Sequence, residues 1–200
     1  MPSSPARLDD AALAQLFSEA RTFNYFLDKP VATETLLEAA RLAEFGPTEA
    51  NTLPGRFLVL TSPEAKAKIG PLMSGNNQAK TVAAPAVIVA AYDIEFYEHL
   101  PKTFPHVDAR SWYVGSDESA KKWSAERSAA LQIGYLIMAL RSLGLDCGPM
   151  GGFDAKGIDA AFFAGTTWRS FVVINVGYGD RSKLRPRNPR LDIDEFVKII

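Results

Sequence analysis

Two segments near opposite ends of the chain carry groups that suit a phosphate. Arg21 is followed by Thr22, so that a guanidinium can make a bidentate contact while the hydroxyl adds a donor. At the other end, residues 179–192 hold Lys183, Arg187 and Arg190 directly after an apolar stretch. Taken separately, each has a plainer explanation: a surface arginine near a helix end, and a solvated basic loop or short RNA contact. The basic run contains no aromatic residue, which argues against stacking on single-stranded nucleic acid.

Two further segments hold groups suited to a polar ring. Residues 45–57, FGPTEANTLPGRF, place Asn51 in a turn, where its amide offers the donor and acceptor that match a flavin's pyrimidine edge. Residues 145–154, LDCGPMGGFD, place Gly151 and Gly152 where a bare backbone can approach the N5 atom of such a ring. A capped turn and a helix-to-helix turn are the competing explanations. The glycine spacing lacks G-x-G-x-x-G and does not indicate a Rossmann site.

The bulk composition excludes several classes of protein. Of 200 residues, 47% are hydrophobic, and the net charge of -1 gives no global field toward nucleic acid or a membrane. The single cysteine excludes an intrachain disulfide, and with only two histidines we expect no metal site. Neither a signal peptide nor a stretch long enough to span a bilayer is visible in the sequence. We therefore expect a cytoplasmic protein.

The sequence predicts a single domain over residues 1–200, with residues 1–8 as a frayed N-terminus. Helices are expected over residues 9–21, 33–46, 62–73, 120–143 and 158–164. Strands are expected over residues 56–61, 85–92 and 169–179, a glycine-rich turn over 148–154, and a closing strand or helix over 191–200. Because the strands are apolar throughout, both faces of the sheet should be covered, which predicts a helix-rich α/β or α+β fold. The second half of the 120–143 helix is apolar almost all round and predicts cover from a second subunit.

Residues 93–116, DIEFYEHLPKTFPHVDARSWYVGS, form a long aromatic segment without a regular period. Long irregular segments in compact domains are more often functional than idle. We therefore take this aromatic segment as the candidate wall of a substrate site, with packing of an ordered loop as the equally simple alternative. Its candidate substrate-binding residues are Phe104, His106, Arg110 and Trp112.

The order of these motifs resembles that of the nitroreductase-like FMN flavoproteins, and the match runs from about residue 12 to the C-terminus. Arg21-Thr22 comes first, then Pro47-Thr48-x-Ala50-Asn51, then Pro-Met-Gly-Gly-Phe-Asp at 149–154, then Gly177-Tyr178 and the basic loop. Four longer strings, DIEFYEHLPKTFPHVDARSWY, GLDCGPMGGFD, DAAFFAG and INVGYGDRSKL, resemble the subfamily that contains the malonic semialdehyde reductase of pyrimidine breakdown. Members of that subfamily are also described as NADH dehydrogenases or NAD(P)H nitroreductases.

The resemblance implies an α+β fold with a small central mixed sheet, in a domain-entwined homodimer with two FMN sites at its interface. The residues implied to hold the FMN phosphate are Arg21 and Arg190, with Arg187 or Lys183 in addition. Thr22, Asn24 and Asn51 are implied to lie against the ribityl chain or the ring, and the main chain of Gly151-Gly152 to face N5. Two departures leave the substrate less defined than the cofactor. Asn24 stands where the family often has a second basic residue, and Leu53-Pro54-Gly55 where many members have Gln-Pro-Trp.

The implied activity is reduction of a small substrate by NADH or NADPH in a ping-pong cycle. No catalytic residue of the protein is expected, because the cofactor carries the chemistry. Arg110 is the candidate for gripping a carboxylate such as that of malonic semialdehyde, and His106 is a candidate general acid. The alternatives are a broad quinone or nitroarene reductase, a non-catalytic FMN-binding dimer, and a nucleic-acid-binding module that uses residues 181–190. The near-neutral net charge makes the last of these the weakest.

Overall fold

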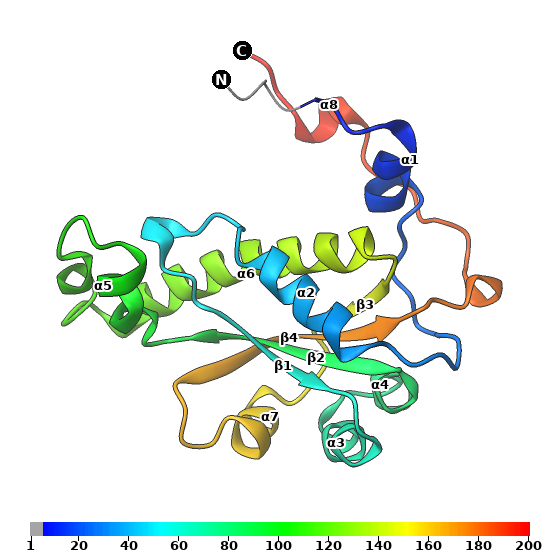
Figure 1. The fold of residues 1–200 in the computed structure, drawn as a ribbon, viewed down its shortest axis with the longest axis horizontal. Coiled ribbons are helices and arrows are strands. Elements are labelled where there is room, and N and C mark those ends of the chain that lie inside the picture. The colour runs from blue at the N-terminus through cyan, green and yellow to red at the C-terminus, as the bar shows by residue number, and fades with distance from the viewer. Residues whose placement is uncertain (1–5) are drawn as a thin grey trace.

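A four-stranded sheet forms the centre of the molecule, and the computed structural model describes residues 6–200 around it (Figure 1). Across the sheet the strands are ordered β1 (Gly55–Leu60), β2 (Ala86–Asp93), β4 (Trp168–Gly177) and β3 (Asp146–Met150). All three neighbouring pairs of these strands are antiparallel. The α+β class is confirmed, but the expectation of a mixed sheet is wrong for these strands. Their continuous apolar character comes from helices on both faces, and such burial does not depend on strand direction.

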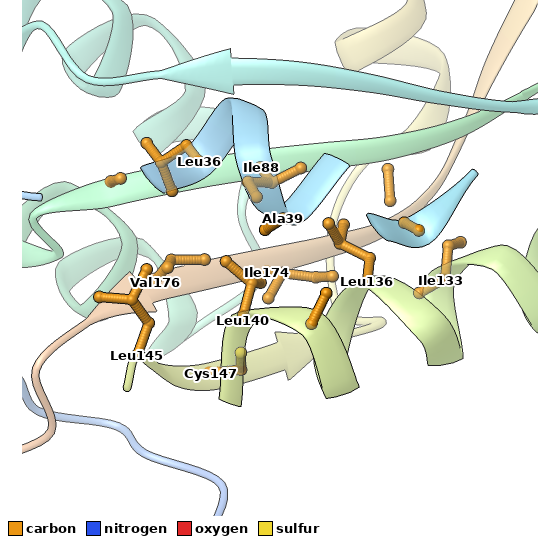
Figure 2. Close-up of a cluster of buried hydrophobic side chains, with 14 residues drawn as sticks. Leu36, Ala39, Ile88, Ile133, Leu136, Leu140, Leu145, Cys147, Ile174 and Val176 are labelled. Carbon is orange, nitrogen blue, oxygen red and sulfur yellow. The ribbon is translucent and has the colours of Figure 1, made fainter. Parts of the chain in front are cut away.

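Helices cover both faces of the sheet (Figure 1). One face carries α2 (Thr33–Ala43) and the long α6 (Glu118–Ser142), and the other carries α3 (Pro63–Ile69), α4 (Asn77–Ala83) and α7 (Ala155–Phe162). Strand β2 is buried along its whole length, and its side chains alternate between the two cores. Ile88 packs against α2 and α6 (Figure 2), whereas Val87 and Val89 pack on the opposite face.

The aromatic segment is ordered as three short helical turns rather than as irregular chain. These turns are η4 (Phe96–His99), α5 (Leu100–Thr103) and η5 (Ala109–Trp112). Phe96 and Leu100 are fully buried and pack with Ala125 and Ala129 on the first half of α6. The segment lacks a regular period because each turn is too short to show one, and its buried side chains come from different turns.

The first predicted helix and the glycine-rich turn both differ from expectation. Asp9 caps α1 (Asp10–Leu13), which continues as the π-helical turn η1 (Ala14–Ser18) and then stops. Beyond it, Thr22 pairs with Cys147 of β3, and Phe26 pairs with Gly179, just past the end of β4. Residues 148–150, predicted as part of a turn, complete β3 because they pair with β4. The other short helices are η2 (Glu49–Asn51), η3 (Gly70–Leu72), η6 (Arg181–Lys183) and α8 (Ile193–Phe196).

Most remaining boundaries agree with the sequence to within a few residues. Thr33 is the first residue of α2 rather than its cap, since Ala32 occupies the N-cap position without a side-chain bond. Gly144 follows α6 with a φ of 77°, as a terminating glycine should. Of the residues predicted to be frayed, 1–5 lie outside the described part of the chain, and residues 6–8 are exposed.

Among residues 6–200, no helix combines the length and the apolar character needed to cross a bilayer. The same residues contain no group of three or more His, Cys, Asp or Glu side chains that could hold a metal ion.

Candidate functional site

Segments from the two ends of the chain enclose a cavity of about 1190 Å³, which we call the cationic cavity. Its walls come mainly from residues 20–26 and 180–190, with α4 and Arg141 of α6 completing them. Seven Lys or Arg residues line it, against one acid. The basic residues are Arg21, Lys80, Arg141, Lys183, Arg185, Arg187 and Arg190. The acid is Asp180, whose carboxylate is engaged by the backbone and hydroxyl of Ser182. The cavity therefore presents an excess of positive charge to an anionic ligand.

Hydrogen bonds hold the two end segments against each other. The Arg21 guanidinium donates to the carbonyl oxygen of Arg185 at 2.7 Å. Arg187 donates in the other direction, to the carbonyl oxygens of Ser18 at 2.6 Å and Ala20 at 2.8 Å. A backbone bridge between Phe26 and Gly179 continues the pairing. The three side-chain bonds join residues more than 160 positions apart in the sequence, and together with the bridge they fix the cation-rich walls.

Phe23 anchors the N-terminal wall to the sheet. Its ring is almost fully buried, and its backbone N–H donates to the carbonyl oxygen of Cys147 in β3 at 3.0 Å. Two glycines make room for it: a Cβ on Gly148 would overlap the Phe23 carbonyl oxygen, and a Cβ on Gly179 would overlap the Phe23 ring. The neighbours Arg21, Thr22 and Asn24 are thereby directed along the cavity wall.

Gly151 and Gly152 lie beside the cationic cavity and are absent from the residues that line it. The carbonyl oxygen of Gly152 accepts from the backbone N–H of Ser74 at 3.0 Å and from the Asn77 amide at 3.1 Å. The helix that begins at Asn77 supplies the α4 wall of the cavity. Gly151 is exposed, and a Cβ there would meet nothing within 4 Å. The backbone at this position is therefore open to a ligand.

Asn51 is not brought to the cationic cavity. It lies in the connection between α2 and β1, which approaches the aromatic segment at the opposite end of the molecule from residues 181–190 (Figure 1). Its amide donates to the carbonyl oxygen of Thr103 at 2.7 Å. The surrounding turn is strained, because Ala50, Asn51 and Leu53 have φ values of 45°, 53° and 44°. Non-glycine residues in this region cost about 1–3 kcal/mol each and gather at functional sites.

The four candidate substrate residues cluster on the aromatic segment. Phe104 packs edge-on against His106 and Trp112, with ring centroids 5.7 and 6.2 Å apart. Arg110 is already paired: it donates to both oxygens of Glu98, at 2.7 and 2.8 Å, and the pair is about half exposed. These hydrogen bonds hold the pKa of the Glu98 carboxyl below its ordinary value. Arg110 also lines a recess of about 250 Å³ on this segment.

Several structurally important residues escaped the sequence analysis. Lys80 and Arg141 add charge to the cavity, and Phe23 docks its wall, but each lies in an ordinary helical or apolar pattern. The buried Asp93 at the end of β2 and the partly buried Arg56 of β1 form an ion pair of 2.8 Å. The sequence contains one indication of this pair, because Asp93 is an acid at the end of a continuous apolar strand.

The fold and the cation-rich cavity, together with the sequence, place this chain in a known class: residues 18–178 match the Nitroreductase family, and the chain belongs to it. A relative from Burkholderia lata is 52% identical over 192 residues, which cover 96% of this chain and 98% of that one. That relative is named "Putative NADH dehydrogenase/NAD(P)H nitroreductase".

Solved structures agree on the fold. A crystal structure from Bacillus subtilis, described as a "putative nitroreductase", superposes with a TM-score of 0.86 at 24% identity and covers 95% of this chain and 99% of that one. A second, from Exiguobacterium sibiricum, is described as a "putative nitroreductase in complex with FMN". It reaches a TM-score of 0.84 at 21% identity, over 99% of this chain and 100% of that one.

Proposed function

We propose that this chain binds FMN and uses it to reduce a small substrate with electrons from NADH or NADPH. The observation that carries the proposal is the convergence of seven basic side chains, five of them from the two ends of the chain, on one cavity with a single, already engaged carboxylate. A phosphate monoester is the anion that such a lining suits, because guanidinium groups bind it in bidentate fashion. The related B. lata protein is named for NAD(P)H-dependent reduction, and the E. sibiricum structure is described with FMN.

Different residues would contact different parts of the cofactor. Arg21 and Arg190, with Lys183 and Arg187, would hold the phosphate, while Thr22 and Asn24 offer polar groups on the same wall. The open backbone at Gly151, with Gly152 beside it, would approach the ring. When bound, FMN supplies the centre that accepts hydride from the nicotinamide and passes electrons to the oxidant. The protein itself orients the two reactants, and we assign it no nucleophile.

A second copy of the chain is part of the proposal, because Asn51 and the aromatic segment lie far from the cationic cavity of their own chain (Figure 1). Large apolar side chains stay exposed on α2 and just after it, on α6 and on the C-terminal residues, among them Phe45 at 75% and Trp123 at 60%. Soluble proteins rarely leave so much apolar surface uncovered. A homodimer would cover it and bring Asn51 and the aromatic segment of one copy to the cavity of the other.

The substrate wall is proposed to be the aromatic segment, with Phe104, His106, Arg110 and Trp112 facing a small oxidant. The subfamily resemblance favours malonic semialdehyde, whose carboxylate Arg110 would bind. A broad nitroarene or quinone reductase is the second candidate, and the Arg110–Glu98 pair favours it because Glu98 already neutralises the arginine. The buried, lone Cys147 suits a reducing compartment, and we propose the cytoplasm.

The test is the cofactor content and reactivity of the purified protein. We expect a yellow protein that releases FMN in acid and is bleached anaerobically by NADH or NADPH. Arg21→Ala should weaken FMN binding about 10- to 150-fold, the range for one hydrogen bond to a charged group. The matched control is Arg7→Ala, which removes an exposed arginine paired with Asp10 outside the cavity.

Three results would count against the proposal. Protein without flavin that does not take up added FMN refutes the cofactor assignment. Bound FMN that no nicotinamide bleaches indicates the non-catalytic flavin-binding dimer instead. Equal FMN affinity in Arg21→Ala and Arg7→Ala removes Arg21 from the phosphate site.

A further inference from the structure

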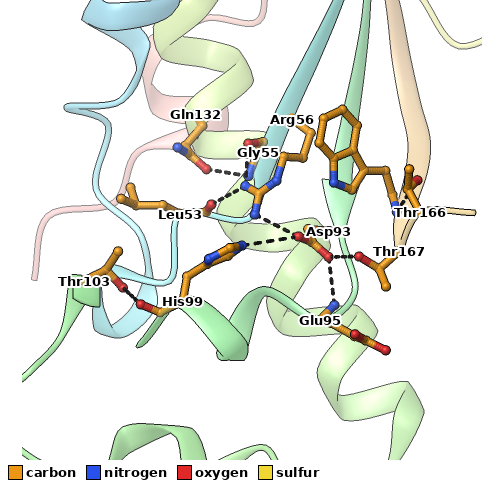
Figure 3. Close-up of polar contacts among 11 residues, drawn as sticks. Leu53, Gly55, Arg56, Asp93, Glu95, His99, Thr103, Gln132, Thr166 and Thr167 are labelled. Carbon is orange, nitrogen blue, oxygen red and sulfur yellow. Dashed lines mark hydrogen bonds and ion pairs between the residues drawn. The ribbon is translucent and has the colours of Figure 1, made fainter. Parts of the chain in front are cut away.

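Asp93 lies at the junction of three structural elements (Figure 3). It is the last residue of β2, and its side chain is almost fully buried. One carboxylate oxygen accepts from Arg56 at 2.8 Å. The other accepts from the Thr167 hydroxyl at 2.6 Å and from the backbone N–H of Glu95 at 3.0 Å. Both oxygens of this buried charge are thus engaged, by partners from β1, from the residue before β4, and from the aromatic segment.

Arg56 links Asp93 to the strained turn. One of its terminal nitrogens holds Asp93, and the other donates to the carbonyl oxygens of Leu53 at 2.8 Å and Gly55 at 3.0 Å. Leu53 is one of the three residues with positive φ. From the other side, the Thr48 hydroxyl accepts from the Leu53 N–H at 3.2 Å. Strained backbone persists where surrounding contacts over-determine it, and Arg56 supplies such contacts here.

The Asp93 carboxylate also fixes the residues that follow it in the aromatic segment. Besides the Glu95 N–H, the His99 ring lies 3.8 Å from Asp93 (Figure 3). The His99 carbonyl oxygen accepts from the Thr103 hydroxyl at 3.3 Å, and the Thr103 carbonyl oxygen accepts from Asn51 at 2.7 Å. The contacts therefore close a ring that runs from Asp93 through Arg56, the turn and Asn51 to Thr103, and back through His99.

We propose that Asp93 is a positioning residue that, through Arg56, holds the strained turn 48–53 and the aromatic segment in one fixed relation. Asn51 and the substrate wall then keep a constant separation when they face a bound cofactor. This inference rests on the proposed function for its consequence in catalysis. The coupling of the strained turn to the aromatic segment rests only on contacts between described residues. Asp93 and Arg56 act through other groups and do not themselves contact the reactants.

The test compares three full-length variants with the wild type. Asp93→Asn keeps the shape and the acceptor for Glu95 and Thr167 but removes the charge that holds Arg56. Arg56→Lys keeps a positive charge, but a single ammonium group cannot bridge Asp93 and the Leu53 carbonyl as the guanidinium fork does. Asp10→Asn is the matched control, because it makes the same change in an exposed ion pair remote from the ring of contacts.

Hydrogen exchange on the protein as purified measures how readily the backbone of each of the two segments opens. In Asp93→Asn we expect amide exchange to accelerate by about tenfold over residues 48–53 and 95–113 together, as for the loss of one charge-assisted contact. In Arg56→Lys only residues 48–53 should accelerate, because Asp93 keeps its contacts with Glu95 and Thr167. Asp10→Asn should match the wild type in both segments.

Steady-state kinetics supplies the second readout. Asp93→Asn should raise the KM for the oxidant about tenfold with a smaller change in kcat, and the protein should still bind FMN, since the basic residues of the cationic cavity are untouched. Faster exchange at residues 93–96 alone, or loosening of both segments without a change in KM, overturns the proposal. A wild type that neither binds FMN nor oxidises NAD(P)H refutes the proposed function separately, and exchange still decides whether Asp93 couples the two segments.

Discussion

Replacing Gly148 with alanine should disturb the wall of the cationic cavity without altering any charged residue. A Cβ at this position overlaps the carbonyl oxygen of Phe23. That oxygen belongs to the backbone, so no side-chain rotation can relieve the clash. Either β3 or the segment around Phe23 must move, and the Phe23 N–H bond to Cys147 ties the two together. The segment around Phe23 also carries Arg21, Thr22 and Asn24, so its displacement would move these three residues.

The expected magnitude follows from the nature of the clash. Overpacking a filled site costs about 1–3 kcal/mol, and an immovable backbone neighbour places Gly148→Ala at the upper end of that range. For a chain of this size, about 3 kcal/mol corresponds to a fall in Tm of roughly 6–12 °C. Urea unfolding monitored by circular dichroism measures the free energy of unfolding. Fluorescence titration with FMN measures affinity, which should fall because the cavity wall is displaced.

Gly151→Ala is the matched comparison, since it adds the same methyl group where nothing lies within 4 Å. It should leave the free energy of unfolding within about 0.5 kcal/mol of wild type, yet lower FMN affinity if this backbone approaches the ring. A Gly148→Ala protein as stable as wild type would refute the docking argument. Unchanged FMN affinity in Gly151→Ala would remove that glycine from the proposed site.

Two further predictions concern titrating groups. Burial raises the pKa of the Cys147 thiol to about 12, so a thiol reagent at pH 8 should not modify the folded protein and should modify one thiol per chain in urea. Arg110 lowers the pKa of Glu98 in the folded state, so the pair contributes stability above the ordinary glutamate pKa and loses it as the pH falls through the lowered value. Arg110→Ala should return the Glu98 pKa to its ordinary range in a carboxyl NMR titration.

The strands and the long helices were predictable because buried elements show a recognisable pattern of apolar residues in the sequence. Strand β2 is apolar from Ala86 to Tyr92, and Pro85 stands just before it. Strand β3 shows no such pattern, since DCGPM contains a glycine and a proline and pairs with one strand only. Its glycine is required by the contact with Phe23, 125 positions earlier, and no local pattern encodes that contact.

The candidate site was only partly predictable for the same reason. The sequence identified which residues could bind a phosphate, and the structure brings Arg21, Thr22 and Asn24 together with Lys183, Arg187 and Arg190. Their meeting depends on tertiary hydrogen bonds such as that from Arg187 to Ala20. The family resemblance implies a site shared by two chains and places Asn51 in it. Within one chain, Asn51 lies against Thr103 instead.

The Arg110–Glu98 pair bears on which class of oxidant the proposed substrate wall would favour. Its partners are 42% and 44% exposed, so water screens the pair and an incoming carboxylate can displace Glu98 at little cost. The displaced Glu98 remains close by and repels the same carboxylate, which cancels much of the attraction to Arg110. A neutral nitroarene or quinone meets neither effect and can stack on the exposed Trp112 ring. We therefore propose that the electrostatics of this wall favours broad specificity over dedicated recognition of a small acid.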